Sequence, residues 1–218
     1  MKQSQAEENY LKAIFKLMKI QPKGVLTKSI GELLEIKSPT VSDMLKKLGD
    51  KKYIKYTKYK GVTLTKSGEK IALKVIRKHR LWETFLVERF KFKWDEVHHI
   101  AEQLEHIDSP ELVKRLDEYL DFPRFDPHGD PIPNEEGVFL QKHEKTLSQI
   151  KEGKQAVMVG VKDHSSEFLQ YLDSNNLRLG STLIVNKITT YDSSFEVKID
   201  ENKVISLSDQ ITKNIIVK

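Results

Sequence analysis

The first fifty residues contain three segments in which apolar side chains recur at helical spacing. One helix is expected over residues 7–18, and a short second helix after Thr27. A third should begin at Ser38, which can cap free N–H groups, with Pro39 at the first helical position, where no N–H is needed. The apolar faces predict a small shared core, made of Tyr10, Leu11, Ile14, Phe15, Met18, Ile30, Leu33, Leu34, Val41, Met44, Leu45 and Leu48.

A β-hairpin is expected directly after the third helix. Residues 53–57 and 61–65 are predicted strands that flank the basic tip Lys58-Tyr59-Lys60. Three helices followed by a hairpin predict a winged helix-turn-helix. The outward face of the third helix is short, polar and basic, and carries Thr40, Ser42, Asp43, Lys46 and Lys47.

The middle of the chain is predicted to be helical. Long helices are expected over about 66–90, 94–107 and 109–120, and we expect them to form a dimer interface. The stretch 121–138 contains four of the seven prolines and two glycines, so it is predicted to be an ordered loop. A last helix is expected at about 139–151.

From residue 155 the pattern changes to short alternating strands. They are expected at 156–161, 182–185, 194–199 and 215–217, with one helix at 165–172. Short strands joined by tight turns in about 65 residues suggest a small β-barrel of the SH3 type.

These elements predict a mostly α protein with small β parts. The expected domains are a winged helix-turn-helix over 1–70, a helical dimerisation domain over 71–150 and a C-terminal SH3-like barrel over 151–218. A chain of 218 residues is long enough for two or three such domains. No apolar run approaches the ~20 residues that span a bilayer, so a cytoplasmic protein without membrane contact is expected.

Charge is distributed unevenly between the two parts of the chain. Residues 1–80 hold 20 Lys and Arg against 7 Asp and Glu, whereas residues 81–218 hold 17 against 25. A strongly basic domain is typical of binding to a phosphate backbone, although a merely solubilising surface would look similar. The acidic remainder holds six of the seven histidines, which favours cation binding there.

A stripe of His and Glu on the expected helix around residue 100 is the strongest chemical signal. Its members fall within an arc of about 100°, and a His/Glu pair four residues apart stands on the preceding long helix. With no cysteine in the chain, such donors suit Mn(II), Fe(II) or Zn(II). A solvated ion-pair face is the alternative. The candidates are His98, Glu102, Glu105 and His106, with His79 and Glu83.

Hydrolytic chemistry finds little support in the sequence. The HExxH pattern of zinc peptidases and the G-x-S-x-G elbow of serine hydrolases are both missing, so we do not expect an enzyme. The remaining hypothesis is a DNA-binding protein whose affinity is set by metal in the adjoining helices. A metal-independent winged-helix regulator and a metal-dependent hydrolase remain as alternatives.

Six segments in order resemble the iron- and manganese-dependent repressors of the diphtheria toxin repressor family. They are EENYLKAIF, SPTVSDMLKKL, GVTLTKSGEKIA, RKHRLWETFL, HHIAEQLEHI and DPHGDPIP, and FLQYLDSNNLRLGSTLIV resembles the SH3-like (FeoA-like) domain of the longer members. The resemblance implies a homodimer that binds a divalent metal, then palindromic operator DNA, and represses metal-uptake genes.

The resemblance also implies two metal sites. One would use His79, Glu83 and His98, with Asp163, His164 and Glu167 as candidates from the C-terminal domain. In manganese-responsive long members the equivalent outer site resembles Glu83, Asp126, His128 and Asp163, and the position of Asp126 is often Cys. The activating site would use Glu102, Glu105 and His106.

Helix 1 would complete the activating site at Asn9, where the family usually has Met or Asp. The neutral amide is a weaker ligand, so Glu7 or Glu8 could substitute, and Asn9 could instead cap the helix. Glu102 stands where iron-responsive members tend to have Cys, which favours Mn(II) over Fe(II), with Zn(II) possible in vitro.

Contacts to DNA are expected from the third helix and the hairpin tip. The short side chains are placed for the groove, and the lysines for phosphate. A metal that joins helix 1 to the helix around residue 100 would shift the population toward the DNA-binding arrangement. The expected contact residues are Ser38, Pro39, Thr40, Ser42, Asp43, Lys46, Lys47, Lys58 and Lys60.

Overall fold

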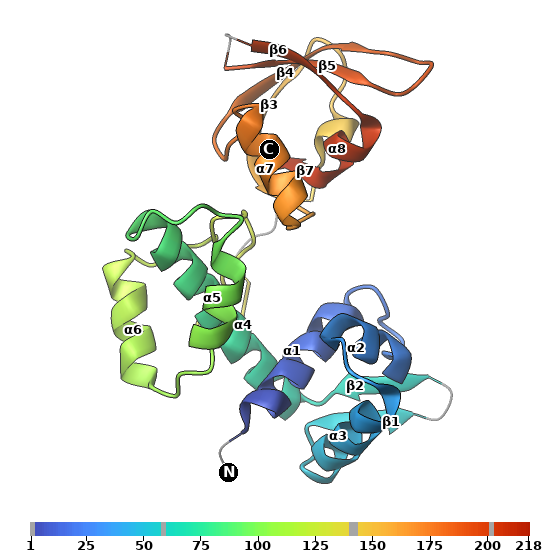
Figure 1. The fold of residues 1–218 in the computed structure, drawn as a ribbon, viewed down its shortest axis with the longest axis vertical. Coiled ribbons are helices and arrows are strands. Elements are labelled where there is room, and N and C mark those ends of the chain that lie inside the picture. The colour runs from blue at the N-terminus through green and yellow to red at the C-terminus, as the bar shows by residue number, and fades with distance from the viewer. Residues whose placement is uncertain (1–2, 58–59, 140–143, 201–202) are drawn as a thin grey trace. The chain divides into compact units, whose positions relative to one another are not determined.

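The structure is a computed structural model, which describes residues 3–57, 60–139, 144–200 and 203–218 (Figure 1). The chain forms two compact units. The first comprises Met1–His79, Gln103–Pro110 and Pro133–Val138; the second comprises Arg80–Glu102, Glu111–Ile132 and Phe139–Lys218. Lys58, one of the expected DNA contacts, lies outside the described residues.

Three helices build the core of the first unit: α1 (Gln5–Met18), α2 (Thr27–Leu34) and α3 (Ser38–Asp50). Ser4 caps α1, because its side chain accepts from the Glu7 N–H while Glu7 accepts from the Ser4 N–H. Apolar residues from all three helices are fully buried together, including Leu11, Ile14, Ile30, Val41 and Leu48.

The hairpin of the first unit pairs β1 (Ile54–Thr57) with β2 (Gly61–Leu64) in antiparallel register. The predicted winged helix-turn-helix is therefore confirmed. One detail of the prediction was wrong: Ser38 is the first residue of α3 and makes no cap, because the N-cap position belongs to Lys37.

Helices α4 (Lys66–Glu88), α5 (Val97–Leu104) and α6 (Pro110–Tyr119) follow. The second half of α4 and most of α6 belong to the second unit, where Leu81, Leu116, Leu120 and Ile132 form a small core. Helix α5 is shorter than expected and ends at Leu104, so Glu105 and His106 lie beyond it. The expected four-residue stripe therefore does not share one helical face.

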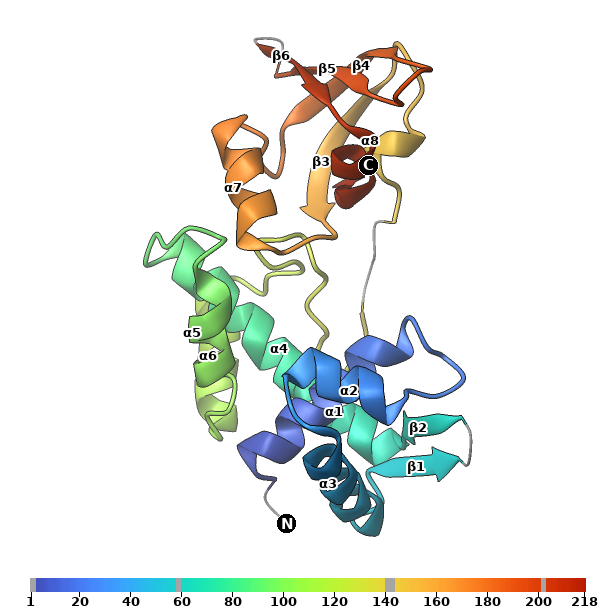
Figure 2. The same ribbon diagram turned by 45° about the vertical axis from the view of Figure 1, so that its right-hand side comes forward.

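A five-stranded antiparallel sheet forms the C-terminal part of the second unit (Figure 2). Its strand order is β6-β5-β4-β3-β7, from β3 (Gln155–Val161), β4 (Thr182–Ile188), β5 (Phe195–Ile199), β6 (Lys203–Leu207) and β7 (Ile215–Val217). Helices α7 (Ser166–Ser174) and α8 (Asp209–Asn214) accompany it. The SH3-like architecture is confirmed, with β6 and α8 as additions.

The helix expected at about 139–151 is not seen in the described part of that stretch. Residues 139 and 144–151 are described, and their only helical element is a 3-10 turn at Leu147–Gln149. The expected domain boundaries near residues 70 and 150 remain a prediction.

Candidate metal centre and DNA-facing surface

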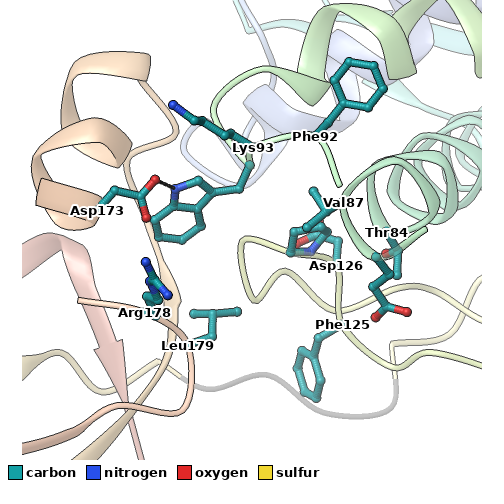
Figure 3. A pocket seen from close by; sticks show the side chains of 12 residues that line it. Thr84, Val87, Phe92, Lys93, Phe125, Asp126, Asp173, Arg178 and Leu179 are labelled. Atoms are coloured by element: carbon teal, nitrogen blue, oxygen red, sulfur yellow. Dashed lines mark hydrogen bonds between the residues drawn. The ribbon is translucent and has the colours of Figure 1, made fainter. Parts of the chain in front are cut away.

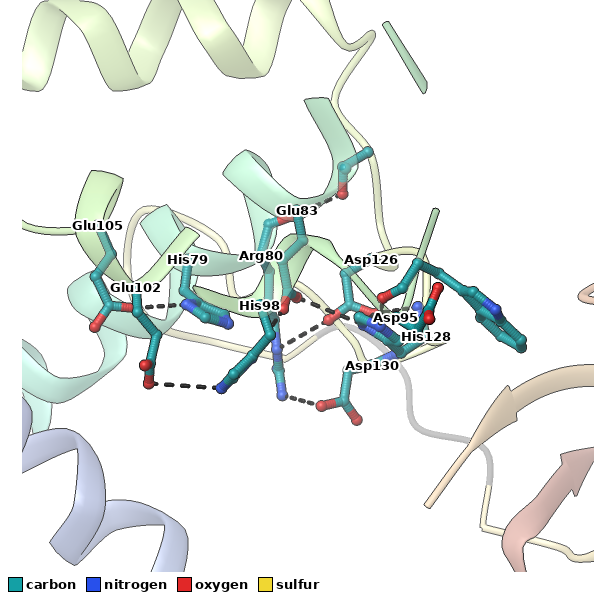
Figure 4. A network of polar contacts seen from close by, with 12 residues as sticks. His79, Arg80, Glu83, Asp95, His98, Glu102, Glu105, Asp126, His128 and Asp130 are labelled. Atoms are coloured by element: carbon teal, nitrogen blue, oxygen red, sulfur yellow. Dashed lines mark hydrogen bonds and ion pairs between the residues drawn. The ribbon is translucent and has the colours of Figure 1, made fainter. Parts of the chain in front are cut away.

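A buried cluster in the second unit gathers Glu83 from α4 with Asp126 and His128 from the loop after α6 (Figure 4). The three residues are 3%, 4% and 2% exposed. Each offers a ligand atom, and these atoms lie within 4.8 Å of one another. His128 Nδ1 lies 3.6 Å from Glu83 Oε2 and 3.8 Å from Asp126 Oδ1. Two buried carboxylates and an imidazole that converge in this way fit a divalent cation.

The backbone of Trp94 fixes the orientation of His128. The Nε2 atom of His128 lies 2.8 Å from the Trp94 carbonyl oxygen, and since a carbonyl can only accept, Nε2 carries the proton. The other nitrogen, Nδ1, is buried and has no hydrogen-bond partner in the described part of the chain. The rings of Trp94 and His164 stack on the imidazole, with centroids at 6.2 and 4.8 Å. A histidine that donates to a carbonyl from one nitrogen presents the other as a metal ligand.

Asp126 is held by its own loop and by Arg80. Its Oδ1 accepts from the backbone N–H groups of His128 and Asp130, at 2.8 and 3.0 Å. Its Oδ2 lies 3.4 Å from Arg80 Nε, and the same guanidinium donates to Asp130 Oδ2 at 2.5 Å. Burial and the nearby Glu83 carboxylate raise the pKa of Asp126 in spite of Arg80. A further positive charge at this position would therefore be stabilising.

The histidines beside Glu83 are charged at neutral pH. His98 on α5 places Nδ1 3.3 Å from Glu83 Oε1 and Nε2 3.5 Å from Glu102 Oε1, and hydrogen bonds to Glu102 and Glu83 raise the pKa of His98 to about 9. Burial lowers the pKa of His128, but Glu83 and Asp126 outweigh it and raise the pKa to about 9. An ion that bound these nitrogens would displace protons.

Close packing holds the ligand loop against the sheet of the second unit. The His128 carbonyl oxygen accepts from the Val161 N–H at 2.9 Å. Gly129 has φ +83°, and a Cβ atom there would lie 2.1 Å from the Val159 carbonyl oxygen. Only glycine therefore allows the loop to approach β3 this closely.

The C-terminal candidates lie just after β3. His164 stacks on His128, as described above, and its side chain is exposed. Asp163 is half-buried, and its Oδ1 accepts from the Ser165 N–H at 2.9 Å. Glu167 is exposed in the first turn of α7. Whether these side chains ligate an ion remains a prediction.

A cavity of about 720 Å³ adjoins the cluster in the second unit (Figure 3). Asp126 lines it together with Trp94, whose indole Nε1 donates to Asp173 Oδ2 at 3.1 Å. Basic and aromatic side chains complete the lining, among them Lys93, Arg178, Phe92 and Phe125. Asp126 is therefore the cluster residue that faces this cavity.

Of the expected activating residues, Glu105 and His106 are found in the first unit, where a lysine accompanies them, whereas Glu102 belongs to the second unit. Lys12 Nζ on α1 lies 2.5 Å from Glu105 Oε1, and His79 Nδ1 lies 2.6 Å from Glu105 Oε2. The Glu105 side chain is fully buried. Burial would raise the pKa of Glu105, but the hydrogen bond from His79 and the charge of Lys12 lower it overall. This carboxylate is therefore ionised and engaged at both oxygens.

His106 contacts Glu8. Its Nδ1 lies 2.6 Å from Glu8 Oε2, while its Nε2 is buried, 3.5 Å from Glu105 Oε1, without a hydrogen-bond partner among the described residues. Asn9 is half-buried in the second turn of α1, so the capping role considered for it was wrong; Ser4 makes the cap. Glu102 contacts His98 instead, as given above, and is 46% exposed.

The DNA-facing candidates on α3 are exposed. Ser42 Oγ donates to the Ser38 carbonyl oxygen at 3.0 Å. The hydroxyl proton of Ser42, one of the short side chains expected to contact the groove, is therefore used within the helix. Lys60, at the hairpin, is also exposed. The expected contact residues of the helix, all of them exposed, are Ser38, Pro39, Thr40, Ser42, Asp43, Lys46 and Lys47.

A buried carboxylate on α1 pairs with two lysines at the C-terminal end of α3. Glu7 Oε1 lies 3.0 Å from Lys47 Nζ and 2.7 Å from Lys51 Nζ, and the Glu7 side chain is 1% exposed. Burial opposes ionisation, yet the hydrogen bonds from Lys51 and Lys47 lower the pKa of Glu7 overall. Lys47 is therefore shared between the surface of α3 and this internal contact.

Sequence patterns did not indicate several of these residues. Arg80 and Trp94 act through contacts to residues far along the chain, and the Trp94 contact uses a backbone oxygen that no side-chain pattern reveals. Lys12 is buried between apolar neighbours of α1, but the helical period does not assign a lysine to the apolar face. The one usable signal was the i, i+4 spacing of Glu8 and Lys12.

Three family models match consecutive parts of the chain. The N-terminal DNA-binding domain of iron-dependent repressors matches residues 2–62. The metal-binding and dimerisation domain of iron-dependent repressors matches residues 65–134. The FeoA domain matches residues 145–218.

Curated relatives agree with these models. The iron-dependent repressor IdeR of Mycobacterium leprae is 36% identical over 128 residues, which are 58% of this chain and 54% of the relative. The chain thus spans about half the length of that relative. An uncharacterised HTH-type transcriptional regulator of Methanocaldococcus jannaschii is 36% identical over 113 residues, which are 52% of this chain and 90% of the relative.

A solved structure extends the similarity to nearly the whole chain. It is a manganese-dependent transcriptional repressor in complex with manganese, with a TM-score of 0.83 and 33% identity, and the match covers 97% of this chain and 98% of that one. In the described part of this chain, no helix is long and apolar enough to cross a membrane.

Proposed function

The chain belongs to the diphtheria toxin repressor family of iron- and manganese-dependent regulators, and from this premise we propose that it is a transcriptional repressor activated by Mn(II). The observation that carries the proposal is the buried Glu83, Asp126 and His128 group, with the His128 proton held on the Trp94 carbonyl. The regulated genes would be those for metal uptake, and the protein would act in the cytoplasm, where its operators lie.

We propose that Glu83, Asp126 and His128 hold the ion, with His98 beside Glu83 and Asp163 or His164 as further ligands from the C-terminal part. His79 stands one turn before Glu83 on α4, and we include it as a further candidate ligand. The buried group of Glu83, Asp126 and His128 offers two carboxylates and one imidazole, and the chain has no cysteine, which favours Mn(II) over softer ions. Fe(II) is the alternative, and Zn(II) would bind in vitro.

A bound cation supplies positive charge that holds the ligands together. Without it, Glu83 and Asp126 are two buried carboxylates that rely on Arg80, His98 and protonated His128 for compensation. Glu83 lies on α4, whose first half belongs to the unit that contains α3. Fixing Glu83 therefore restrains the helix that leads out of the DNA-binding unit. Coupling of this type amounts to ~1–3 kcal/mol, or about 5- to 150-fold in DNA affinity.

The exposed face of α3 is the proposed contact to operator DNA. Residues 1–80 carry the excess of basic side chains described above, and phosphate contacts from such a surface release counterions. Lys46, Lys47 and Lys60 would contact phosphate, while Thr40, Ser42 and Asp43 face the groove. Few of these side chains can bind a base in bidentate fashion, so DNA shape should contribute to specificity.

A homodimer would match the two halves of a palindromic operator. Three exposed aromatic side chains of the second unit, here called the aromatic group, support a homodimer. Phe90 is 63% exposed, Tyr119 60% and Phe122 62%. Phe85 contacts the first two, with ring centroids at 4.8 and 6.1 Å. Exposed aromatics gathered in this way are typical of protein interfaces.

The test is fluorescence anisotropy at fixed salt, with a labelled fragment from upstream of the protein's own gene. We expect Mn(II) to raise DNA affinity about tenfold or more over chelator, inside the coupling range above, and Asp126→Ala to abolish that gain. The gain in DNA affinity that remains in Asp163→Ala and in His164→Ala ranks these two C-terminal candidates. The gain produced by Fe(II) and by Zn(II) in the wild type ranks the ions. Equal affinity in chelator and in Mn(II) would overturn the proposal and favour a metal-independent regulator, in which Arg80 and the histidines alone balance the carboxylates.

A further inference from the structure

The geometry of the first unit points to a lysine where a second metal ion would be expected. We propose that the Lys12 ammonium is the resident cation of Glu105 and His106, so that each chain binds one divalent ion, at the Glu83 centre. This inference rests on the proposed metal-activated function and changes the number of ions that carry it out.

The Lys12 ammonium group and His106 Nε2 both lie near the same oxygen of Glu105. Lys12 Nζ lies 2.5 Å from Glu105 Oε1, and that same oxygen lies 3.5 Å from His106 Nε2. The three side chains are 7%, 0% and 5% exposed. Lysine is almost never buried to this degree unless it is paired with an acidic group, so the contact with Glu105 is what makes the burial of Lys12 possible.

The donors that an ion would need are already engaged. His79 Nδ1 takes the second oxygen of Glu105 at 2.6 Å, and Glu8 Oε2 lies 2.6 Å from His106 Nδ1. In the described residues of the first unit, no three His, Asp or Glu side chains bring ligand atoms within 4.8 Å of one another. His106 Nε2 lacks a hydrogen-bond partner among the described residues, and one imidazole nitrogen does not hold a divalent ion.

The charges of the α1 side chains near residues 105–106 support the same inference. Glu8 and Lys12 stand one turn apart on α1, so this helix brings one negative and one positive side chain to residues 105–106. Of the other candidates on α1, Asn9 is neutral and Glu7 pairs with Lys47 and Lys51. A divalent ion beside a buried ammonium group would meet like charge where water cannot screen it. The ion would have to expel Lys12 and leave its charge without a partner.

A resident cation has a consequence for regulation. The contact of α1 with residues 105–106 would persist at every metal concentration, because the lysine cannot dissociate. Control by metal would then act through the Glu83 centre alone.

The experiment is a count of Mn(II) bound per chain, by equilibrium dialysis with elemental analysis, on the full chain. We expect one ion in the wild type, none in Asp126→Ala, and two in Lys12→Met, where Glu105 and His106 are released. Lys16→Met is the matched control, because Lys16 is one turn further along α1, exposed, and carries the same charge. It should bind one ion.

Two ions in the wild type, with the second lost in His106→Ala, would overturn the inference and leave the metal-activated function intact. No ion in the wild type would instead overturn the proposed function. Amine-reactive labelling read by mass spectrometry tests the same point without a variant: Lys12 should stay protected in chelator and in saturating Mn(II) alike. Labelling of Lys12 that increases with Mn(II) would mean that the ion displaces it.

Discussion

His128 donates from Nε2 to the carbonyl oxygen of Trp94 at 2.8 Å, and this contact aims Nδ1 at the carboxylates of Glu83 and Asp126. A backbone acceptor cannot rotate away or change its protonation, so Nε2 keeps its proton, and Nδ1 is the nitrogen that gives up its proton when the ring becomes a ligand. The stacked rings of Trp94 and His164 restrict the imidazole further. The site is thus organised before any ion arrives, which lowers the cost of binding one.

Replacing Gly129 by alanine should damage this organisation. The added Cβ would clash with the Val159 carbonyl oxygen at 2.1 Å in a backbone conformation with φ +83°. We expect Gly129→Ala to lower Mn(II) affinity about 10- to 100-fold, as changes that misplace ligands typically do. Isothermal titration calorimetry measures it. Gly180→Ala is the matched control, since Gly180 has φ +91° and open space around it, and its Mn(II) affinity should equal that of the wild type.

Metal affinity should rise with pH. The carboxylates around His98 and His128 raise both pKa values to about 9, so both rings are protonated below that pH in the metal-free protein. Each ring that becomes a ligand must release its proton, so apparent affinity should increase about tenfold per pH unit for each proton released, up to about pH 9. Calorimetry under anaerobic conditions, in buffers of different ionisation enthalpy, counts the protons. Identical Mn(II) affinity at pH 6.5 and 8 would contradict the proposed role of His128.

Helical periodicity in the sequence predicted much of the fold. Apolar residues such as Leu11, Ile14 and Val41 recur at the spacing that a buried helical face requires, and they are fully buried. Periodicity failed for short elements. Helix α8 spans six residues, too few for the period to repeat, and β6 alternates around an exposed Val204.

The resemblance identified the group of Glu83, Asp126 and His128, whose ligand atoms lie within 4.8 Å of one another, whereas the expected helical stripe around residue 100 does not form one group. Because α5 ends at Leu104, Glu105 and His106 leave the helical stripe, which divides into a His98–Glu102 pair and a Glu105–His106 pair. The roles of Arg80 and Lys12 depend on contacts with residues 46 and 93 positions away, which no local pattern encodes.

Arg80 should hold the metal-free cluster together. Its guanidinium reaches both Asp126 and Asp130, and the removal of one partner from a buried ion pair costs ~3–5 kcal/mol. We expect Arg80→Met to lower the free energy of unfolding by about that amount in chelator, measured by urea denaturation. The increase in stability caused by Mn(II) should be larger than in the wild type, because the ion then replaces the lost charge. Arg115→Met is the control, since its pair with Glu111 is exposed and contributes ~0.3–0.5 kcal/mol.

Glu7 should make the first unit sensitive to acid. Its pKa lies below the ordinary value of 4.5 in the folded chain, so its stabilising effect is present above that pH and is lost as pH falls. We expect Glu7→Gln to reduce stability by ~1–3 kcal/mol at pH 7 and to flatten the loss between pH 5 and 3, followed by circular dichroism. An equal loss at pH 7 and at pH 3 would mean that the ion pairs with Lys47 and Lys51 are not the cause. Glu32→Gln, at an exposed pair with Lys28, is the control and should change little.

Phe90 should be a contact residue of the proposed dimer. It is 63% exposed yet packs on Phe85 with ring centroids 4.8 Å apart, so a partner could cover it without reorganising the core. We expect Phe90→Asp to raise the dimer dissociation constant about tenfold or more, as the loss of a central aromatic contact typically does. Analytical ultracentrifugation measures it. Tyr191→Asp is the matched control, because Tyr191 is 98% exposed in the C-terminal part and lies outside the aromatic group. Since a monomer can meet only one operator half at a time, Phe90→Asp should also weaken DNA binding at saturating Mn(II), whereas unchanged dimerisation would move the interface to another surface of the chain.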